Sequence, residues 1–396
     1  MSTAFAQRLA SVDAALLSPF VRQALGDDSA AVLDWRCVPL RGGMAQANGG
    51  SYGVYRFSGQ ARCHDTVQAW SLVLKATAAA VLAAGSIASA DESHIFYWKR
   101  EVLIYQSGLL ADLPDGLVAV RCLGVVEYPD QEFWIWLEDV EDSTWVRQDY
   151  RLVAYHLGQF NGAYLAGRPL PRASWLSSGP VQLWLEWAEP GIAEIETLSR
   201  LPINRLWVDS SGVARMRNLW AQRERLLCGL DRLPRTFCHH DAYRRNLMLR
   251  RSRMGKRESV AVDWAAAGTG GVGVELEALI GAGASMYQIP ARELKDYEAT
   301  AFGGYMAGLR QAGCDVNPRT VRFGFAAAAA LHYGVGLTGF LLSVLADEQQ
   351  VQFLERFFGR PRGELMAEQA VFHRYFLDLG EEALALLEQL KVAGQL

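Results

Sequence analysis

Three short segments near the start of the chain alternate apolar and polar residues or run apolar. They cover residues 30–40, 51–57 and 66–76, and clusters of Gly and Asn separate them. Successive side chains of an extended chain point to opposite faces, so this spacing is typical of half-buried β-strands. The pattern therefore predicts three β-strands in the first eighty residues.

A helix and two further strands are expected next. Residues 91–113, "DESHIFYWKREVLIYQSGLLADL", begin with acidic residues and then repeat apolar positions at helical spacing. Residues 117–128 and 132–140 return to apolar runs rich in Val, Ile and aromatic side chains. The predicted order is three strands, a helix and two strands.

Helical spacing dominates beyond residue 140. Residues 150–167 and 211–233 predict helices, and helical segments continue from Glu275 to the end of the chain. One exception lies between them, where the apolar runs 247–249 and 260–262 flank a turn rich in Gly and Arg, as in a β-hairpin. We therefore predict an α+β protein with a small β-rich domain, residues 1–138, and a large helical domain, residues 139–396.

Composition and charge narrow the function classes. The 396 residues are 51% hydrophobic and 21% charged, and the formal net charge of −4 argues against binding to nucleic acid or an anionic membrane. Six scattered cysteines form no C-x-x-C pair, which fits a reducing compartment. Residues 1–20 lack the apolar core of a signal peptide, and the apolar run 323–346 contains His332 and Tyr333, which favours a buried helix. A cytoplasmic protein is expected.

The stretch "TFCHHDAYRRNLMLR", residues 236–250, is crowded with chemically active side chains. Consecutive side chains from Cys238 to Asp241 would point to opposite faces of an extended chain, which disfavours a transition-metal site. Phosphoryl transfer explains more positions. Asp241 can accept a hydrogen bond from an attacking hydroxyl, and Asn246 with Asp263 can share magnesium ions that bridge nucleotide phosphates.

A phosphoryl-transfer site also needs a cation for the nucleotide phosphates. Lys75 ends the predicted strand 66–76 between apolar residues that would bury its stem. A buried lysine needs a carboxylate partner, and Glu101 on the following predicted helix is the candidate. An ordinary lysine at a strand end is the alternative for Lys75 taken alone, but the ordered Asp241, Asn246 and Asp263 favour the functional interpretation.

In this order, Lys75, Glu101, "HHDAYRRN" and "VDW" resemble the aminoglycoside phosphotransferase and choline kinase family. The resemblance implies a protein-kinase-like two-lobed fold, with a five-stranded antiparallel sheet and a helix in the N-lobe and a mainly helical C-lobe. It implies ATP (or GTP) and Mg²⁺ as cofactors and a small-molecule hydroxyl as acceptor. By analogy, Asp241 is the catalytic base, Asn246 and Asp263 hold magnesium, and Lys75, fixed by Glu101, binds the phosphates.

Two further nucleotide contacts follow from the resemblance. Residues 138–140 fall where the family places its hinge, so backbone groups of Glu138 and Val140 would meet the nucleotide base. Gly49, Gly50 and Ser51 lie where a phosphate-covering loop is expected, and their backbone N–H groups could approach phosphate. A plain glycine turn fits those three residues equally well.

The chain departs from the family pattern at several positions. His240 stands where the family has Gly, "AYRR" replaces a segment with Pro, and Glu275 stands where an Asp anchors the catalytic loop; His239 is expected to hold that loop. Tyr243, Arg244 and Arg245 could either shape the substrate environment or simply pack. The glycine-rich "GTGGVG", residues 268–273, does not open a helix directly after a strand as a Rossmann turn would, and we expect a flexible segment that contacts substrate or covers the cleft.

The sequence leaves the acceptor open. Trp175, Trp184 and Trp187 with several glutamates suit a cationic or sugar-like ligand, but an amphipathic helix with buried aromatics explains them as well. A catalytically idle nucleotide-binding scaffold and a kinase acting on a protein hydroxyl are the rival functions. The short segment after Asp263 lacks an A-P-E motif, which favours a small acceptor.

Overall fold

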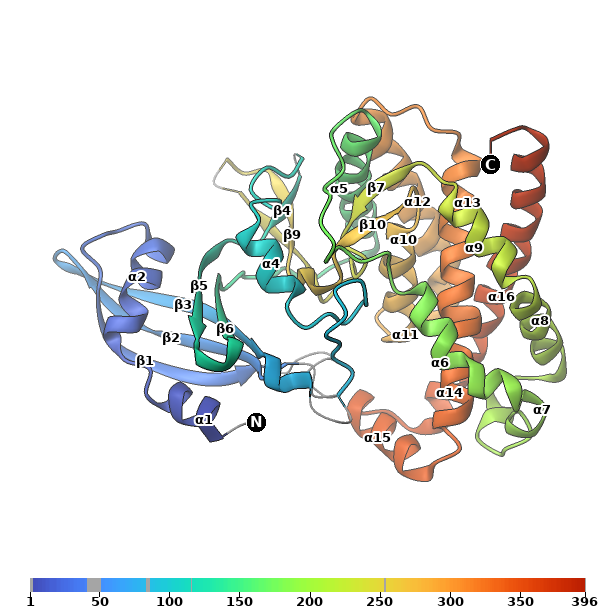
Figure 1. The fold of residues 1–396 in the computed structure, drawn as a ribbon, viewed down its shortest axis with the longest axis horizontal. Helices are drawn as coiled ribbons and strands as arrows, with labels where there is room; N and C mark the ends of the chain where they lie inside the picture. Colours follow the sequence, from blue (N-terminus) through green and yellow to red (C-terminus); the bar gives the residue numbers. More distant parts are fainter. Residues whose placement is uncertain (1–2, 41–50, 83–85, 115, 253, 396) are drawn as a thin grey trace.

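The computed structural model describes residues 3–40, 51–82, 86–114, 116–252 and 254–395. A β-rich part, formed by the first third of the chain, lies beside a larger helical part (Figure 1). The strands β4 (Leu117–Ala119) and β9 (Arg257–Ala261) and the helix α4 (Arg100–Gln106) lie between the two (Figure 1). The α+β class predicted from the sequence is confirmed.

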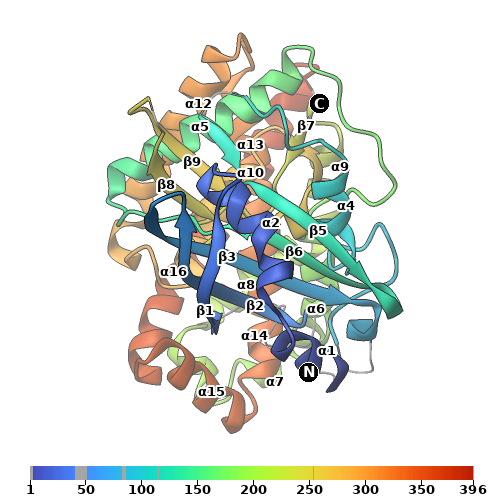
Figure 2. The same cartoon turned by 90° about the vertical axis from the view of Figure 1, so that its left-hand side faces the viewer.

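The first part is built on a five-stranded antiparallel sheet with the order β1-β2-β3-β6-β5. Its aromatic core includes Phe57, Trp134 and Trp136, all at most 1% exposed. Helices α1 and α2 pack on the sheet (Figure 2). Phe5 of α1 packs against Trp134, and Phe20 of α2 packs against Trp136. The elements are α1 (Thr3–Ala10), α2 (Ala14–Leu25), β1 (Ala31–Leu40), β2 (Gly53–Cys63), β3 (Thr66–Ala78), β5 (Cys122–Tyr128) and β6 (Glu132–Glu138).

The helix expected over 91–113 is shorter than predicted. A 3-10 helix, η1 (Ala79–Leu82), follows β3, and α4 spans only Arg100–Gln106. The residues before it form turns, because the Arg100 guanidinium binds the carbonyls of Glu92, His94 and Ile95. Those carbonyls would otherwise accept the first hydrogen bonds of a longer helix.

The segment predicted as one strand over 117–128 divides in two. Residues Leu117–Ala119 form β4, which pairs in parallel with β9 (Arg257–Ala261) rather than with the five-stranded sheet. The predicted hairpin is present, since β9 also pairs antiparallel with β8 (Leu247–Arg251). The division into domains at 138/139 stays a prediction.

The glycine-rich segment after Asp263 is a strand, so the flexible cover expected there is wrong. Residues Gly268–Gly271 form β10, which pairs antiparallel with β7 (Arg235–Cys238) and is largely buried. A Cβ on Gly268 would collide with the backbone carbonyl of Ser177. The glycines allow backbones to approach closely in the core rather than lending mobility.

The helical part packs around α5, α12, α13 and α16 (Figure 1). The apolar run Pro318–Val344 passes by length and composition for a membrane span, but 83% of its most apolar window is buried inside the protein. The helices are α5 (Arg147–Leu165), α6 (Val181–Ala193), α7 (Ile195–Leu198), η3 (Asn204–Leu206), α8 (Ser210–Ala221), α9 (Arg223–Asp231), η4 (Trp264–Ala266), α10 (Glu275–Glu277), η5 (Ala278–Ala282), α11 (Gly283–Ser285), η6 (Ala291–Glu293), α12 (Leu294–Gln311), α13 (Pro318–Ala329), η7 (Ala330–Leu337), α14 (Thr338–Val344), α15 (Glu348–Phe358) and α16 (Arg362–Val392).

Candidate active site

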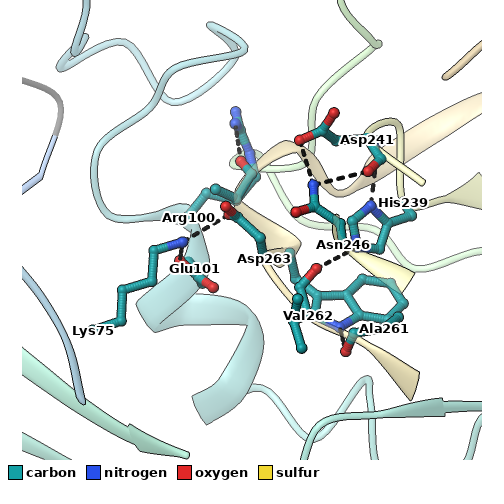
Figure 3. A network of polar contacts seen from close by, with 11 residues as sticks. Lys75, Arg100, Glu101, His239, Asp241, Asn246, Ala261, Val262 and Asp263 are labelled. Atoms are coloured by element: carbon teal, nitrogen blue, oxygen red, sulfur yellow. Dashed lines mark hydrogen bonds and ion pairs between the residues drawn. The ribbon is translucent and has the colours of Figure 1, made fainter. Parts of the chain in front are cut away.

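The predicted catalytic loop connects β7 to β8 and brings Asp241 and Asn246 together. The Asn246 Nδ2 donates to Asp241 Oδ2 at 2.6 Å and to the Asp241 backbone oxygen at 3.0 Å (Figure 3). The loop closes through a hydrogen bond from the Leu247 N–H to the Tyr243 carbonyl at 2.9 Å. The Asp241 side chain is therefore held in place by its own loop.

His239 joins this loop to the residue before Asp263. The Asp241 N–H donates to His239 Nδ1 at 3.3 Å, and His239 Nε2 lies 3.0 Å from the Val262 carbonyl oxygen. Because Nδ1 accepts, Nε2 carries the proton and donates. Burial lowers the pKa of the His239 imidazole to about 4, so the ring is neutral. His239 holds the loop, as the sequence led us to expect.

Glu275 holds the start of the catalytic loop through its carboxylate. Its two oxygens accept the backbone N–H groups of His239 and His240 at 2.9 and 3.0 Å. The side chain is fully buried, and burial raises the pKa of the Glu275 carboxyl to about 7. The extra methylene relative to aspartate therefore still permits a two-pronged anchor.

This buried carboxyl gives the folding stability a specific pH dependence. The folded-state pKa of about 7 lies above the ordinary 4.5, so the contribution of Glu275 is complete below pH 4.5 and is lost as the pH rises through 7. Glutamine keeps one acceptor oxygen but turns an NH2 group toward the second backbone N–H, so we expect Glu275→Gln to be less stable than the wild type by about 1–3 kcal/mol near pH 4.5. Because the amide does not ionise, this deficit should shrink by roughly 3 kcal/mol by pH 8.

Denaturant unfolding of both proteins across this pH range measures the difference. Glu388→Gln, at an exposed position on α16, is the matched control and should show no such trend. A pH-independent difference between Glu275→Gln and the wild type would contradict the assignment.

His240 adopts a backbone conformation that favours glycine, with φ at 63°. Its side chain is buried, and a Cβ on Gly179 or Gly270 would press on the imidazole ring. The departure from the family's glycine therefore places a strained residue next to Asp241. Two neighbouring glycines make room for it.

Lys75, Glu101 and Asp263 form the second half of the site (Figure 3). Lys75 leaves β3 and ion-pairs with Glu101 of α4, as predicted, and its Nζ also lies 2.7 Å from Asp263 Oδ1. Asp263 has a φ of 59°, which turns the chain sharply after β9. The sequence did not predict the direct contact between Lys75 and Asp263.

The charges in this half of the site are strongly coupled. Burial raises the pKa of the Glu101 carboxyl to about 7 against the pull of Lys75. Partial removal from water also acts to raise the pKa of Asp263, but the charge of Lys75 outweighs it and keeps that pKa below its ordinary value. Across the site, burial and then the charge of Asp263 raise the pKa of Asp241 well above its ordinary range.

The donor set fits a hard cation such as Mg²⁺. Because Asn246 donates through Nδ2 to Asp241, its Oδ1 remains as an oxygen ligand, and the Asp263 side chain is 43% exposed. Mg²⁺ prefers oxygen ligands and keeps several waters or phosphate oxygens, so two protein ligands suffice. No group of three His, Cys, Asp or Glu side chains suited to a metal ion occurs in the described part of the chain.

The remaining predicted nucleotide contacts are placed as follows. Glu138 ends β6, where its N–H donates to the Arg121 carbonyl at 3.0 Å and its Oε1 accepts from Arg250 at 2.8 Å. Val140 lies two residues after Glu138 and is half-buried. Ser51 lies just before β2, whose residue Val54 pairs with Lys75. Gly49 and Gly50 lie outside the described residues. Contact of these residues with a nucleotide stays a prediction.

The sequence left the roles of Tyr243, Arg244 and Arg245 open, and the structure gives these three residues different surroundings. Arg244 Nη1 donates to Asp142 Oδ2 at 2.6 Å and its guanidinium stacks over Trp145, so it fastens the loop to the segment before α5. Tyr243 is half-buried and interacts with Asp241 and Arg245. Arg245 is exposed, with its guanidinium carbon 5.9 Å from the Phe357 ring.

Of the three tryptophans suggested as a wall for an acceptor, one is buried and two are half-buried. Trp184 is 9% exposed and packs against His332 and Phe340. Trp175 and Trp187 are half-buried, with Trp187 stacked on Phe96. The glutamates of α6 are exposed. The pattern of α6 is amphipathic, and a role of this region in acceptor binding stays a prediction.

Arg100 is a residue near the site that the sequence analysis did not single out. It lies beside Glu101, is completely buried and contacts the segment that follows Asp263. Its partners are backbone carbonyls, which carry no side-chain signal in the sequence.

No family model matches the sequence, and no curated protein matches it. The structure is similar to solved structures of small-molecule kinases. A spectinomycin phosphotransferase in complex with ADP and spectinomycin is 13% identical, with a TM-score of 0.48 over 95% of this chain and 99% of that one. A choline/ethanolamine kinase family protein from Mesorhizobium loti is 12% identical, with a TM-score of 0.46 over 89% and 92% of the two chains.

An amicoumacin kinase in complex with AMP-PNP and Ca²⁺ is 13% identical, with a TM-score of 0.46 over 88% of this chain and 92% of that one. The spectinomycin phosphotransferase and the choline/ethanolamine kinase family protein carry names of the kind that the sequence motifs resemble. The likeness concerns the fold, so the function is inferred from the site itself.

Proposed function

We propose that the protein is an ATP- and Mg²⁺-dependent kinase that transfers the γ-phosphoryl group to the hydroxyl of a small molecule. The observation that carries this proposal is one connected network. Lys75 contacts both Glu101 and Asp263, while the Asp241–Asn246 pair is tied through His239 to Val262, the neighbour of Asp263 (Figure 3). A phosphate-binding cation, oxygen ligands for a metal and a hydroxyl-orienting carboxylate thus share one site.

The reaction assigns a role to each residue. The acceptor oxygen attacks the γ-phosphorus, its proton passes to the Asp241 carboxylate, and the bond between the γ-phosphorus and the bridging oxygen breaks to release ADP. Lys75 neutralises the nucleotide phosphates, and Glu101 keeps its ammonium in position. Mg²⁺, held by Asn246 and Asp263, would supply charge neutralisation of the phosphate oxygens.

A panel of small hydroxyl compounds, read by ADP release with and without Mg²⁺, tests this function. We expect at least one amino alcohol, sugar, nucleoside or aminoglycoside to accelerate ADP release well above hydrolysis by water, and only with the metal. Nucleotide binding without ADP release from any acceptor would instead favour the idle scaffold. Transfer to added protein substrates alone would favour the protein kinase.

A further inference from the structure

Arg100 is a buried arginine near the site whose guanidinium N–H groups all have hydrogen-bond partners. It is 0% exposed and begins α4, directly before Glu101. An arginine side chain has five N–H donors, and here they make five hydrogen bonds. All five acceptors are backbone carbonyl oxygens, so the guanidinium organises main chain rather than neutralising a carboxylate.

The five carbonyls come from three separate segments. Nη1 and Nη2 bind the turn before α4, at Glu92, His94 and Ile95, with distances of 2.7 to 2.9 Å. Nε donates to the carbonyl of Trp175, in the connection between α5 and α6. Nη1 also donates to the carbonyl of Ala265 at 3.0 Å, two residues beyond Asp263.

The neighbouring Glu101 lies close to the same turn. Its carboxylate pairs with Lys75, and the Trp264 backbone near it acts to lower the pKa of that carboxyl. Two consecutive residues of α4 therefore lie against η4, the turn that begins directly after Asp263. Lys75 contacts both Glu101 of α4 and Asp263, which directly precedes η4. The distance between Lys75 and Asp263 therefore depends on how α4 packs against η4.

The connection at Trp175 extends this seating to a third segment. The Ser177 N–H donates to the Ala267 carbonyl at 3.1 Å, and the Thr269 N–H donates to the Ser177 carbonyl at 2.9 Å. The α5–α6 connection thus runs alongside the chain that follows Asp263. Arg100 stands where this connection, η4 and the turn before α4 meet.

We propose that Arg100 is a positioning residue that fixes α4, with Glu101 and Lys75, against the Asp263 turn. The expected effect of Arg100 on catalysis rests on the proposed function. Its expected effect on the structure rests on the five hydrogen bonds alone. Lysine has three donors on a single nitrogen and cannot reach three separated segments together, so it does not substitute for the guanidinium.

The test compares Arg100→Met and Arg100→Lys with Arg322→Met and Arg322→Lys. Arg322 is a well-engaged arginine of α13 that pairs with Glu298 and Glu382, so its loss also destabilises the fold. Steady-state ADP release in the full chain is measured at a temperature at which melting curves show every variant folded. We expect Arg100→Met to lower kcat at least tenfold and to raise KM for Mg·ATP several-fold, with Arg100→Lys restoring melting temperature more than kcat.

The Arg322 variants should keep both constants within about twofold at an equal or greater loss of melting temperature. Wild-type constants in Arg100→Met, or constants that follow melting temperature alike in both series, would overturn the proposal.

Backbone amide exchange without nucleotide decides the structural part independently. In Arg100→Met, exchange should accelerate at residues 92–98, 175–178 and 264–267 together, and these segments should stay protected in Arg322→Met. Unchanged exchange in Arg100→Met would overturn the positioning role. An inactive wild type would instead reject the proposed kinase, and the exchange result would still decide whether Arg100 holds the three segments.

Discussion

Asp241→Asn should lower phosphoryl transfer by about 10²–10⁴-fold and leave nucleotide affinity within about twofold of the wild type. Asparagine keeps an oxygen that can accept from Asn246 Nδ2, so the loop geometry survives. It removes the carboxylate that we propose orients the acceptor hydroxyl and takes its proton. ADP release in the presence of an accepted alcohol measures the first quantity, and calorimetry with a non-hydrolysable ATP analogue measures the second.

The matched control for this variant is Asp296→Asn, an exposed aspartate of α12 that pairs with Arg147. It should be indistinguishable from the wild type in both measurements. Retained turnover in Asp241→Asn would remove this residue from the chemistry and with it the assigned mechanism.

Asp263→Ala should abolish the Mg²⁺ dependence of nucleotide binding. The variant removes one of the two proposed oxygen ligands and also the partner that lies 2.7 Å from Lys75. We expect affinity with Mg²⁺ to fall by more than about 100-fold, beyond the 10–100-fold typical of losing an outer-shell partner of a metal. Affinity measured in a chelator should change only a few-fold, since Glu101 still holds Lys75.

Calorimetric titration with and without Mg²⁺ provides both numbers. Asp142→Ala is a useful comparison, because it loses the Arg244 ion pair at the same loop without touching a proposed ligand. It should lower stability while keeping the metal dependence. A Mg²⁺ effect in Asp263→Ala equal to that of the wild type would place the metal elsewhere.

Residues that act within one short segment were the easiest to predict. The Asp241–Asn246 spacing encodes a closed loop, and its hydrogen bond connects residues only five apart. The Lys75–Glu101 pair followed from the charge rule for a buried lysine. By contrast, the contact between Lys75 and Asp263 spans 188 positions, and no local pattern carries that information.

The errors in the predicted elements have physical causes that also lie outside the local sequence. The helix over 91–113 begins late because Arg100 captures carbonyls that the pattern assigned to helical hydrogen bonds. The glycines after Asp263 suggested mobility, yet they form β10 because a neighbouring backbone needs their space. In both places, backbone partners contributed by distant segments decide the local structure.

The pairing of β4 with β9 sets a condition on engineering this protein. Residues Leu117–Ala119 precede the last two strands of the N-terminal sheet, yet they form a ladder with a strand that leads to Asp263. A chimaera that exchanged residues 1–138 as a block would pair a foreign edge strand with the hairpin that leads to Asp263, a proposed metal ligand. The transplantable unit is therefore not a contiguous stretch of chain, and a graft that preserves the site must retain the native 117–119 segment.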